Sequence, residues 1–139
     1  MPIEHQWMDD AHTLVVITLE GKVTAEDYYA GDARMCAMLD SVDHSVDVIC
    51  DYSRQYYFGP GYAERVKKME SLFRPNLRSA IFVGTKLSWE LFDLYTSTFE
   101  AVPFKYTYTE TLQEARELIA EIRFEERLIE RRPPSPESN

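Results

Sequence analysis

The feature that most constrains the fold of this chain is one apolar segment. This segment ends in polar residues and leads toward a glycine-rich turn. It runs from Val46 to Ser53, and the turn Gly59-Pro60-Gly61 follows. The part from Val46 to Cys50 is typical of an inner strand of a parallel sheet, which is buried on both faces. Ligands of open α/β sheets bind outside the carboxyl ends of such strands. We therefore expect the functional site directly after Cys50.

The spacing of apolar residues predicts the remaining elements. Strands are expected at 3–8, 14–19, 46–50, 79–83 and 104–108, and helices at 25–42, 62–73, 87–99 and from Thr109 or Thr111 to about 122. Thr24 is expected to cap the first helix, with Asp27 completing a capping box. Beyond Ile122 the apolar pattern thins, so those turns are expected to project from the domain or to pack on a partner. Residues 53–61 are expected to form a loop.

The order β-β-α-β-α-β-α-β-α predicts an α/β fold with a mixed five-stranded sheet and four helices. The opening hairpin is antiparallel because its connection is too short for a crossover, whereas strands joined through helices are parallel. Residues 1–132 are expected to form one domain, and the proline-rich residues 133–139 a disordered tail.

Composition narrows the classes of function. The formal net charge of -9 makes nucleic acid an unfavourable partner. No apolar stretch approaches the roughly 20 residues of a membrane-spanning helix. Cys36 and Cys50 do not form a CxxC pair and are expected to be buried, reduced thiols. Because the first residues also lack the pattern of a secretory signal, we predict a cytoplasmic protein.

The helix expected at 87–99 has an unusually wide apolar surface. Its large side chains are Trp89, Phe92, Tyr95 and Phe99, in addition to a leucine stripe. A helix that covers one face of a sheet does not need so broad a surface. These four residues are predicted to form the interface of a homodimer; the alternative is that the helix is wedged between elements of its own chain.

Two short motifs resemble those of STAS domains, the fold of bacterial anti-sigma-factor antagonists. Asp51-Tyr52-Ser53 is similar to the Asp-x-Ser that ends the central strand of antagonists, and Thr109 to Ala115 resembles the end of the last strand and the acidic-capped helix after it. The resemblance covers about Ile3 to Ile122. It implies a STAS-like fold and a regulatory binding function.

The phosphorylation switch of the antagonists is not implied. Their second motif, Asp-Ser-Ser-Gly, opens the next helix and offers its first serine for phosphorylation. By counting from Asp51, that serine falls on Pro60, which has no hydroxyl.

A response-regulator receiver is a weaker alternative. Asp51, Thr85 and Lys105 resemble the aspartate, threonine and lysine of a receiver in residue type and in their order along the chain. A receiver also needs an acidic pair after its first strand to hold magnesium. Here that position carries Glu20-Gly21-Lys22, and Asp9-Asp10 precede the strand, at the wrong end of the sheet.

No complete catalytic or metal-binding set is visible. His5, His12 and His44 do not have metal-ligand spacing, and the sequence contains no GxSxG, GxGxxG or P-loop motif. We therefore predict no metal, no cofactor and no catalytic residue. An enzyme that uses Asp51 with Ser53, Arg54 or Tyr56 is the least favoured alternative.

The aromatic segment after the central strand is the predicted binding site. Its residues are Asp51, Tyr52, Ser53, Arg54, Tyr56, Tyr57 and Phe58, with Gln55 among them. Rings and hydrogen-bond donors on one loop suit recognition of a protein or a small apolar ligand. The alternative is that some of these rings close the core. A second functional alternative is a carrier of lipid or another small ligand, with the helix at 87–99 as a movable lid.

Overall fold

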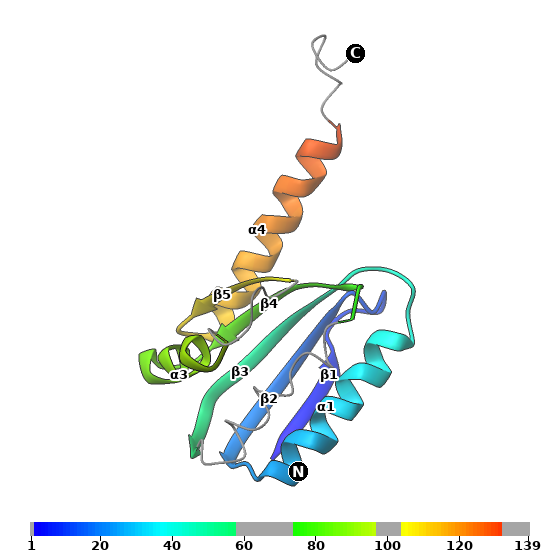
Figure 1. The fold of residues 1–139 in the computed structure, drawn as a ribbon. Coiled ribbons are helices and arrows are strands. Elements are labelled where there is room, and N and C mark those ends of the chain that lie inside the picture. The colour runs from blue at the N-terminus through cyan, green and yellow to red at the C-terminus, as the bar shows by residue number, and fades with distance from the viewer. Residues whose placement is uncertain (1, 58–73, 97–103, 132–139) are drawn as a thin grey trace.

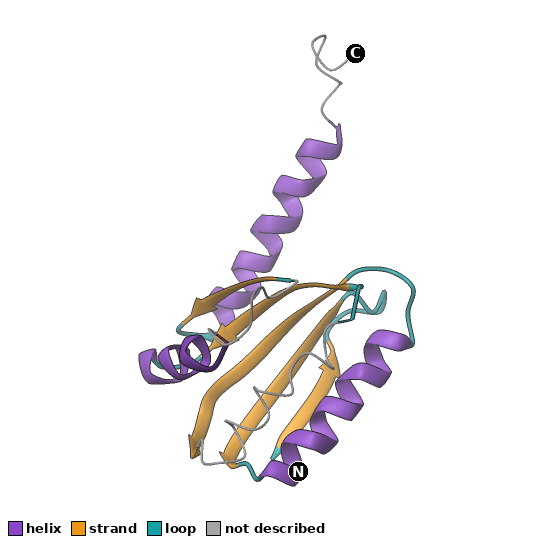
Figure 2. Ribbon diagram, viewed as in Figure 1, coloured by secondary structure: helices purple, strands orange, loops and turns teal. Residues whose placement is uncertain are grey.

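The computed structural model of this protein describes residues 2–57, 74–96 and 104–131. In these ranges three helices flank one five-stranded sheet (Figures 1 and 2). The elements are β1 (Ile3–Trp7), β2 (Leu14–Lys22), α1 (Ala25–Asp40), β3 (Val46–Tyr57), β4 (Leu77–Val83), α3 (Lys86–Thr96), β5 (Lys105–Thr109) and α4 (Leu112–Arg131). The helix expected at 62–73 and the tail at 133–139 lie outside the described residues.

The sheet has the predicted topology. Its strands follow each other in the order β1-β2-β3-β4-β5, which makes β3 the central strand. β1 and β2 are antiparallel, and every later neighbour is parallel. The carboxyl ends of β2, β3, β4 and β5 therefore lie at one edge of the sheet and their amino ends at the opposite edge.

The start of α1 confirms the predicted cap. The Thr24 hydroxyl accepts a hydrogen bond from the backbone N–H of Asp27 (3.2 Å), and the Asp27 carboxylate accepts one from the N–H of Thr24 (2.9 Å). This reciprocal box satisfies two donors that the first turn of a helix leaves open. The helix therefore begins at a position that the sequence fixes.

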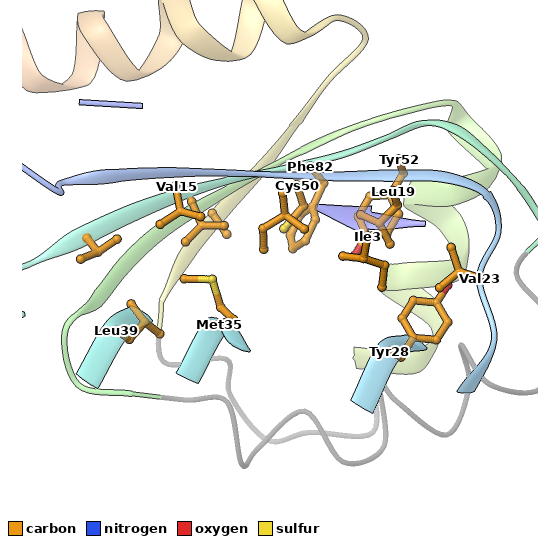
Figure 3. Close-up of a cluster of buried hydrophobic side chains, with 14 residues drawn as sticks. Ile3, Val15, Leu19, Val23, Tyr28, Met35, Leu39, Cys50, Tyr52 and Phe82 are labelled. Atoms are coloured by element: carbon orange, nitrogen blue, oxygen red, sulfur yellow. The ribbon is translucent and has the colours of Figure 1, made fainter. Parts of the chain in front are cut away.

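The sheet carries a hydrophobic cluster on each face. On the side of α1, side chains of four strands pack with Tyr28, Met35 and Leu39 of the helix (Figure 3). On the other side, Ala115 and Ile119 of α4 pack against a smaller cluster that includes Ile49 and Ile81. Because β3 contributes to both clusters, its central part is buried on both faces, as predicted.

Several predicted boundaries were wrong. β3 continues to Tyr57, so residues 53–57 are strand and not loop, and β2 continues to Lys22. Both extensions have one cause, since β2 and β3 keep pairing with each other beyond their apolar parts. β4 begins earlier, at Leu77. α3 is described from Lys86 to Thr96, and residues 97–99 of the predicted helix lie outside the described part. The helix α4 begins after Thr111, whose hydroxyl accepts a hydrogen bond from the N–H of Glu114 (3.1 Å).

None of the helices that the structure describes combines the length and the apolar character needed to cross a membrane.

Candidate functional site

β3 extends past its neighbour β4 at the carboxyl edge of the sheet. The last β3–β4 pair is Asp51 with Val83, whereas pairing with β2 continues as far as Tyr57. We call residues 52–57 the β3 overhang. Figure 1 shows β3 and β2 reaching beyond the end of β4 at this edge. The overhang contains most of the residues predicted to form the binding site.

A β-bulge shapes the beginning of the overhang. Thr18 pairs with Asp51 and Glu20 with Arg54, so one residue of β2 faces two residues of β3, Tyr52 and Ser53. Such a bulge interrupts the alternation of side chains between the two faces. As a result Ser53 and Arg54, although consecutive, are both exposed. On the partner strand Gly21 has a φ of 69°, which glycine adopts without steric cost.

The carboxylate of Asp51 supports the bulge. It is buried and accepts hydrogen bonds from the backbone N–H of Ser53 (2.9 Å) and from the Ser53 hydroxyl (2.5 Å). An aspartate that bonds the backbone two residues ahead stabilises a local turn. Asp51, which was predicted to belong to the binding site, therefore shapes the backbone here, and its buried carboxylate presents little surface to a ligand.

Two predicted site residues point into the core. Tyr52 is buried, and its ring lies 6.1 Å from the ring of Phe82 (Figure 3). Gln55 is also buried, and its side-chain N–H donates a hydrogen bond to the hydroxyl of Tyr28 on α1. Tyr52 thus follows the alternative in which part of the segment closes the core. Tyr56 and Tyr57 belong to β3, but their side chains, like the whole of Phe58, lie outside the described part.

Of the predicted dimer residues, only Trp89 is described in detail. Its ring packs on Tyr108 of β5 at 5.5 Å, so part of the aromatic surface of α3 contacts the protein's own sheet. The side chains of Phe92 and Tyr95, and the whole of Phe99, lie outside the described part. Leu87 at the start of α3 is exposed.

The structure also contains a buried ionic cluster that the sequence analysis missed. It consists of Asp47, Arg78, Ser79, Arg123 and Glu126, and we call it the Asp47 cluster. It lies at the amino edge of the parallel strands, opposite the β3 overhang. Asp47 is the second residue of β3, and its side chain is only 2% exposed.

Both carboxylate oxygens of Asp47 accept several hydrogen bonds. Arg78 donates to both oxygens (3.0 and 2.6 Å), Arg123 donates two bonds to one of them (3.1 and 2.9 Å), and the Ser79 hydroxyl donates one (2.6 Å). Arg123 also donates to the backbone carbonyl of Thr13 (3.0 Å), and Arg78 to Glu126 (2.8 Å). The cluster thereby ties β3, β4 and α4 together.

A second bulge allows two consecutive residues of β4 to reach Asp47. Val46 pairs with Leu77, but Asp47 pairs with Ser79, so Arg78 is the extra residue of β4. Without the bulge, Arg78 and Ser79 would point to opposite faces of the sheet. The backbone irregularity is therefore what completes the cluster.

The two arginines keep Asp47 ionised. Burial alone would raise the pKa of this carboxyl, but hydrogen bonds from Arg78, Ser79 and Arg123 outweigh it and hold the pKa below its ordinary value. The same contact, led by the hydrogen bond to Asp47, raises the pKa of Arg78. The cluster is thus a permanently charged anchor over the physiological pH range.

An open groove of about 470 Å³ lies beside the Asp47 cluster. Arg78, Arg123 and Arg127 line it together with Glu126 and Glu130. Because Arg78 and Arg123 are already engaged with Asp47, the charges along the groove are nearly balanced. In the described ranges, no three histidine, cysteine, aspartate or glutamate side chains are close enough together to hold a metal ion.

One sequence signal could have revealed the cluster. Asp47 interrupts an otherwise apolar run, and a charged residue at a buried position is normally paired. Arg123 likewise follows the apolar stripe of α4 directly. Which arginine pairs with which aspartate depends on the fold, so spacing alone could not identify the partners.

Comparison with known proteins supports the fold. No family model matches the sequence, and no curated protein is significantly similar to it. Among solved structures, the fold resembles that of an uncharacterized protein of the DUF3478 family with a SpoIIAA-like fold, from Shewanella loihica PV-4. The TM-score is 0.61 at 14% identity, and the match covers 84% of this chain and 90% of the other. At this identity the likeness shows the architecture alone.

Proposed function

Given that the fold is SpoIIAA-like, and therefore STAS-like, we propose that this chain is a non-enzymatic cytoplasmic binding module that recognises a protein partner at the β3 overhang. The coarse part of the sequence prediction, the STAS-like architecture, is confirmed. The partner and its binding site are our proposal.

The exposed pair Ser53 and Arg54 carries this proposal. The bulge leaves two consecutive residues, Ser53 and Arg54, exposed at the carboxyl edge of the central strand. The Arg54 guanidinium can donate directional hydrogen bonds and the Ser53 hydroxyl oxygen can accept them, and binding sites of open α/β sheets gather at this edge. The neighbouring residues Asp51, Tyr52 and Gln55 are buried in the interior, so the backbone that carries Ser53 and Arg54 is held in place.

The proposed recognition does not depend on phosphorylation at the position used by antagonists. That position carries Pro60 in this sequence. Ser53 is the serine of the β3 overhang, and its bond to Asp51 makes it part of the local backbone structure. The homodimer through Trp89, Phe92, Tyr95 and Phe99 stays a prediction.

Site-specific photocrosslinking tests the proposal. A photoreactive amino acid at Arg54, in protein expressed in its own host, should capture one specific partner, whereas the same group at the exposed Arg34 of α1 should not. The double variant Ser53→Lys/Arg54→Glu should abolish capture of that partner by an affinity-tagged chain. Its thermal midpoint should fall only modestly, since the variant loses the Ser53 hydroxyl bond to Asp51 but keeps the Ser53 N–H bond to the same carboxylate. Undiminished capture by this variant would refute the site.

Native mass spectrometry separates this function from that of a small-ligand carrier. Between α1 and the sheet, the described residues line two small pockets, of about 50 and 40 Å³. Typical ligand sites have volumes of roughly 300 Å³ or more. Freshly purified protein should therefore show the mass of the chain alone; a bound lipid would favour the carrier.

A further inference from the structure

The outward face of α4 has an unusual composition for a helix end that leaves the sheet. Ala115 and Ile119 anchor the first half of α4 on the sheet, and Arg123 and Glu126 continue on the same side through the Asp47 cluster. Phe124 and Leu128, one turn apart, lie on the opposite side and are 59% and 54% exposed. Figure 1 shows this half of α4 extending away from the other elements.

A row of negative charge borders this apolar pair. Glu114, Glu117, Glu121 and Glu125 recur at intervals of three and four residues, and all are exposed. At this spacing they form one line along the helix, adjacent to Phe124 and Leu128. Arg127, on the other flank, donates a hydrogen bond to the backbone carbonyl of Arg123. The surface on the glutamate side of the apolar pair is therefore acidic.

The Asp47 cluster makes this half of α4 a fixed element. An isolated helix of a few turns is marginally stable in water. Here two charged contacts, from Arg123 to Asp47 and from Arg78 to Glu126, hold the inward side against the sheet. Since these contacts use only the inward side, they leave Phe124 and Leu128 uncovered on the outward side.

We propose that this outward face of α4 binds a basic amphipathic helix of another protein, in which lysine or arginine side chains surround large apolar ones. The apolar pair supplies the anchor, and the glutamate row selects a positively charged partner. A second copy of this chain fits less well, because it would set one glutamate row against another. An anionic membrane surface is disfavoured by the same charges. The face is distinct from the β3 overhang, so it is independent of the proposed function.

Fluorescence anisotropy with designed peptides tests the proposal. The probe is a short labelled peptide of leucine and lysine patterned as an amphipathic helix, and the comparison peptide replaces each lysine by glutamate. The full chain should bind the basic peptide and not the acidic one. Phe124→Ser/Leu128→Ser should weaken binding about tenfold or more, and so should Glu121→Lys/Glu125→Lys. Circular dichroism should show that both variants keep the fold, since the changed side chains are exposed.

The matched control is Glu4→Lys/Glu90→Lys, which changes the net charge equally at exposed positions on β1 and α3. It should leave binding within about twofold of the wild type, because it is remote from α4. Equal weakening by both charge-reversal pairs would overturn the proposal, since binding would then follow net charge alone.

Two further results would also overturn it. One is sedimentation of the wild type as a dimer that Phe124→Ser/Leu128→Ser converts to a monomer, which would make the face a self-interface. The other is binding to vesicles of phosphatidylcholine and phosphatidylglycerol that the same variant abolishes, which would make it a membrane surface.

Discussion

At the scale of single residues, Asp47 accepts most of the hydrogen bonds of the cluster at the amino edge of the parallel strands. It is almost fully buried, and each of its hydrogen-bond donors comes from β4 or α4. Removing one partner of a buried ion pair leaves the other charges uncompensated, and that penalty exceeds what the intact pair contributes. Asp47 is therefore central to the attachment of α4 and β4 at this edge.

Asp47→Asn should lower the free energy of unfolding by about 3 kcal/mol, near the low end for buried pairs because Arg78 and Arg123 are partly exposed. Urea denaturation would measure the change. The matched control is Asp43→Asn, at a fully exposed aspartate four residues earlier, which should change stability by less than about 0.5 kcal/mol. A small effect at both positions would contradict the anchoring role.

Stability should also depend on pH through Asp47. Because its pKa in the folded protein lies below the ordinary value, the folded state binds fewer protons, and Asp47 stabilises the fold at pH values above about 4. That contribution disappears as the pH falls through the lowered pKa. The difference in unfolding free energy between wild type and Asp47→Asn should therefore shrink as the pH is lowered from about 6 to below 3. A constant difference over this range would speak against an ionised Asp47.

At the scale of elements, local signals and long-range pairing determine different boundaries. The start of α1 depends on Thr24 and Asp27, which are neighbours in sequence, and sequence alone located it. The end of β3 depends on continued pairing with β2, and no local pattern within residues 51–57 predicts where the strand ends. The Asp47 cluster was missed for the same reason, since Arg123 lies 76 residues from Asp47 in the chain.

The topology was predictable because it follows from the order of elements. Short connections enforce an antiparallel hairpin, and helical crossovers enforce parallel strands. The burial of Tyr52 and Gln55 was not predictable, because a bulge changed which side chains face inward. Aromatic composition alone could not separate recognition from packing at those positions.

The capping box of α1 should make a measurable contribution to stability. Thr24→Ala removes the acceptor for the N–H of Asp27 and should lower the free energy of unfolding by about 1 kcal/mol. Thr24→Ser keeps the hydroxyl and should retain most of the wild-type stability. Thermal unfolding of the three proteins side by side provides the measurement. Equal loss in both variants would mean that packing of the threonine methyl group, and not capping, matters at this position.

At the scale of the whole molecule, stability should be distributed unevenly. β3 contributes side chains to both hydrophobic clusters, whereas the end of α4 contributes to neither and depends on charged contacts. Regions with few buried apolar contacts open at lower free energy than the core.

Native-state hydrogen exchange should reveal this gradient. Amides of Val48, Ile49 and Cys50 should exchange most slowly, with free energies near that of global unfolding. Amides from Phe124 to Arg131 should exchange much faster in the isolated protein. If they exchanged as slowly as β3, this half of α4 would have to be covered already, and a free outward face would be ruled out.

The Asp47 cluster and the β3 overhang lie at opposite ends of the same strand. Substitutions that adapt the β3 overhang to a new binding target need not disturb the charged hydrogen bonds of the Asp47 cluster. A library randomised at the exposed Arg54 should consequently consist mostly of folded members. The fold thus separates the residues of the Asp47 cluster, which maintain the structure, from exposed residues of the β3 overhang, which can vary.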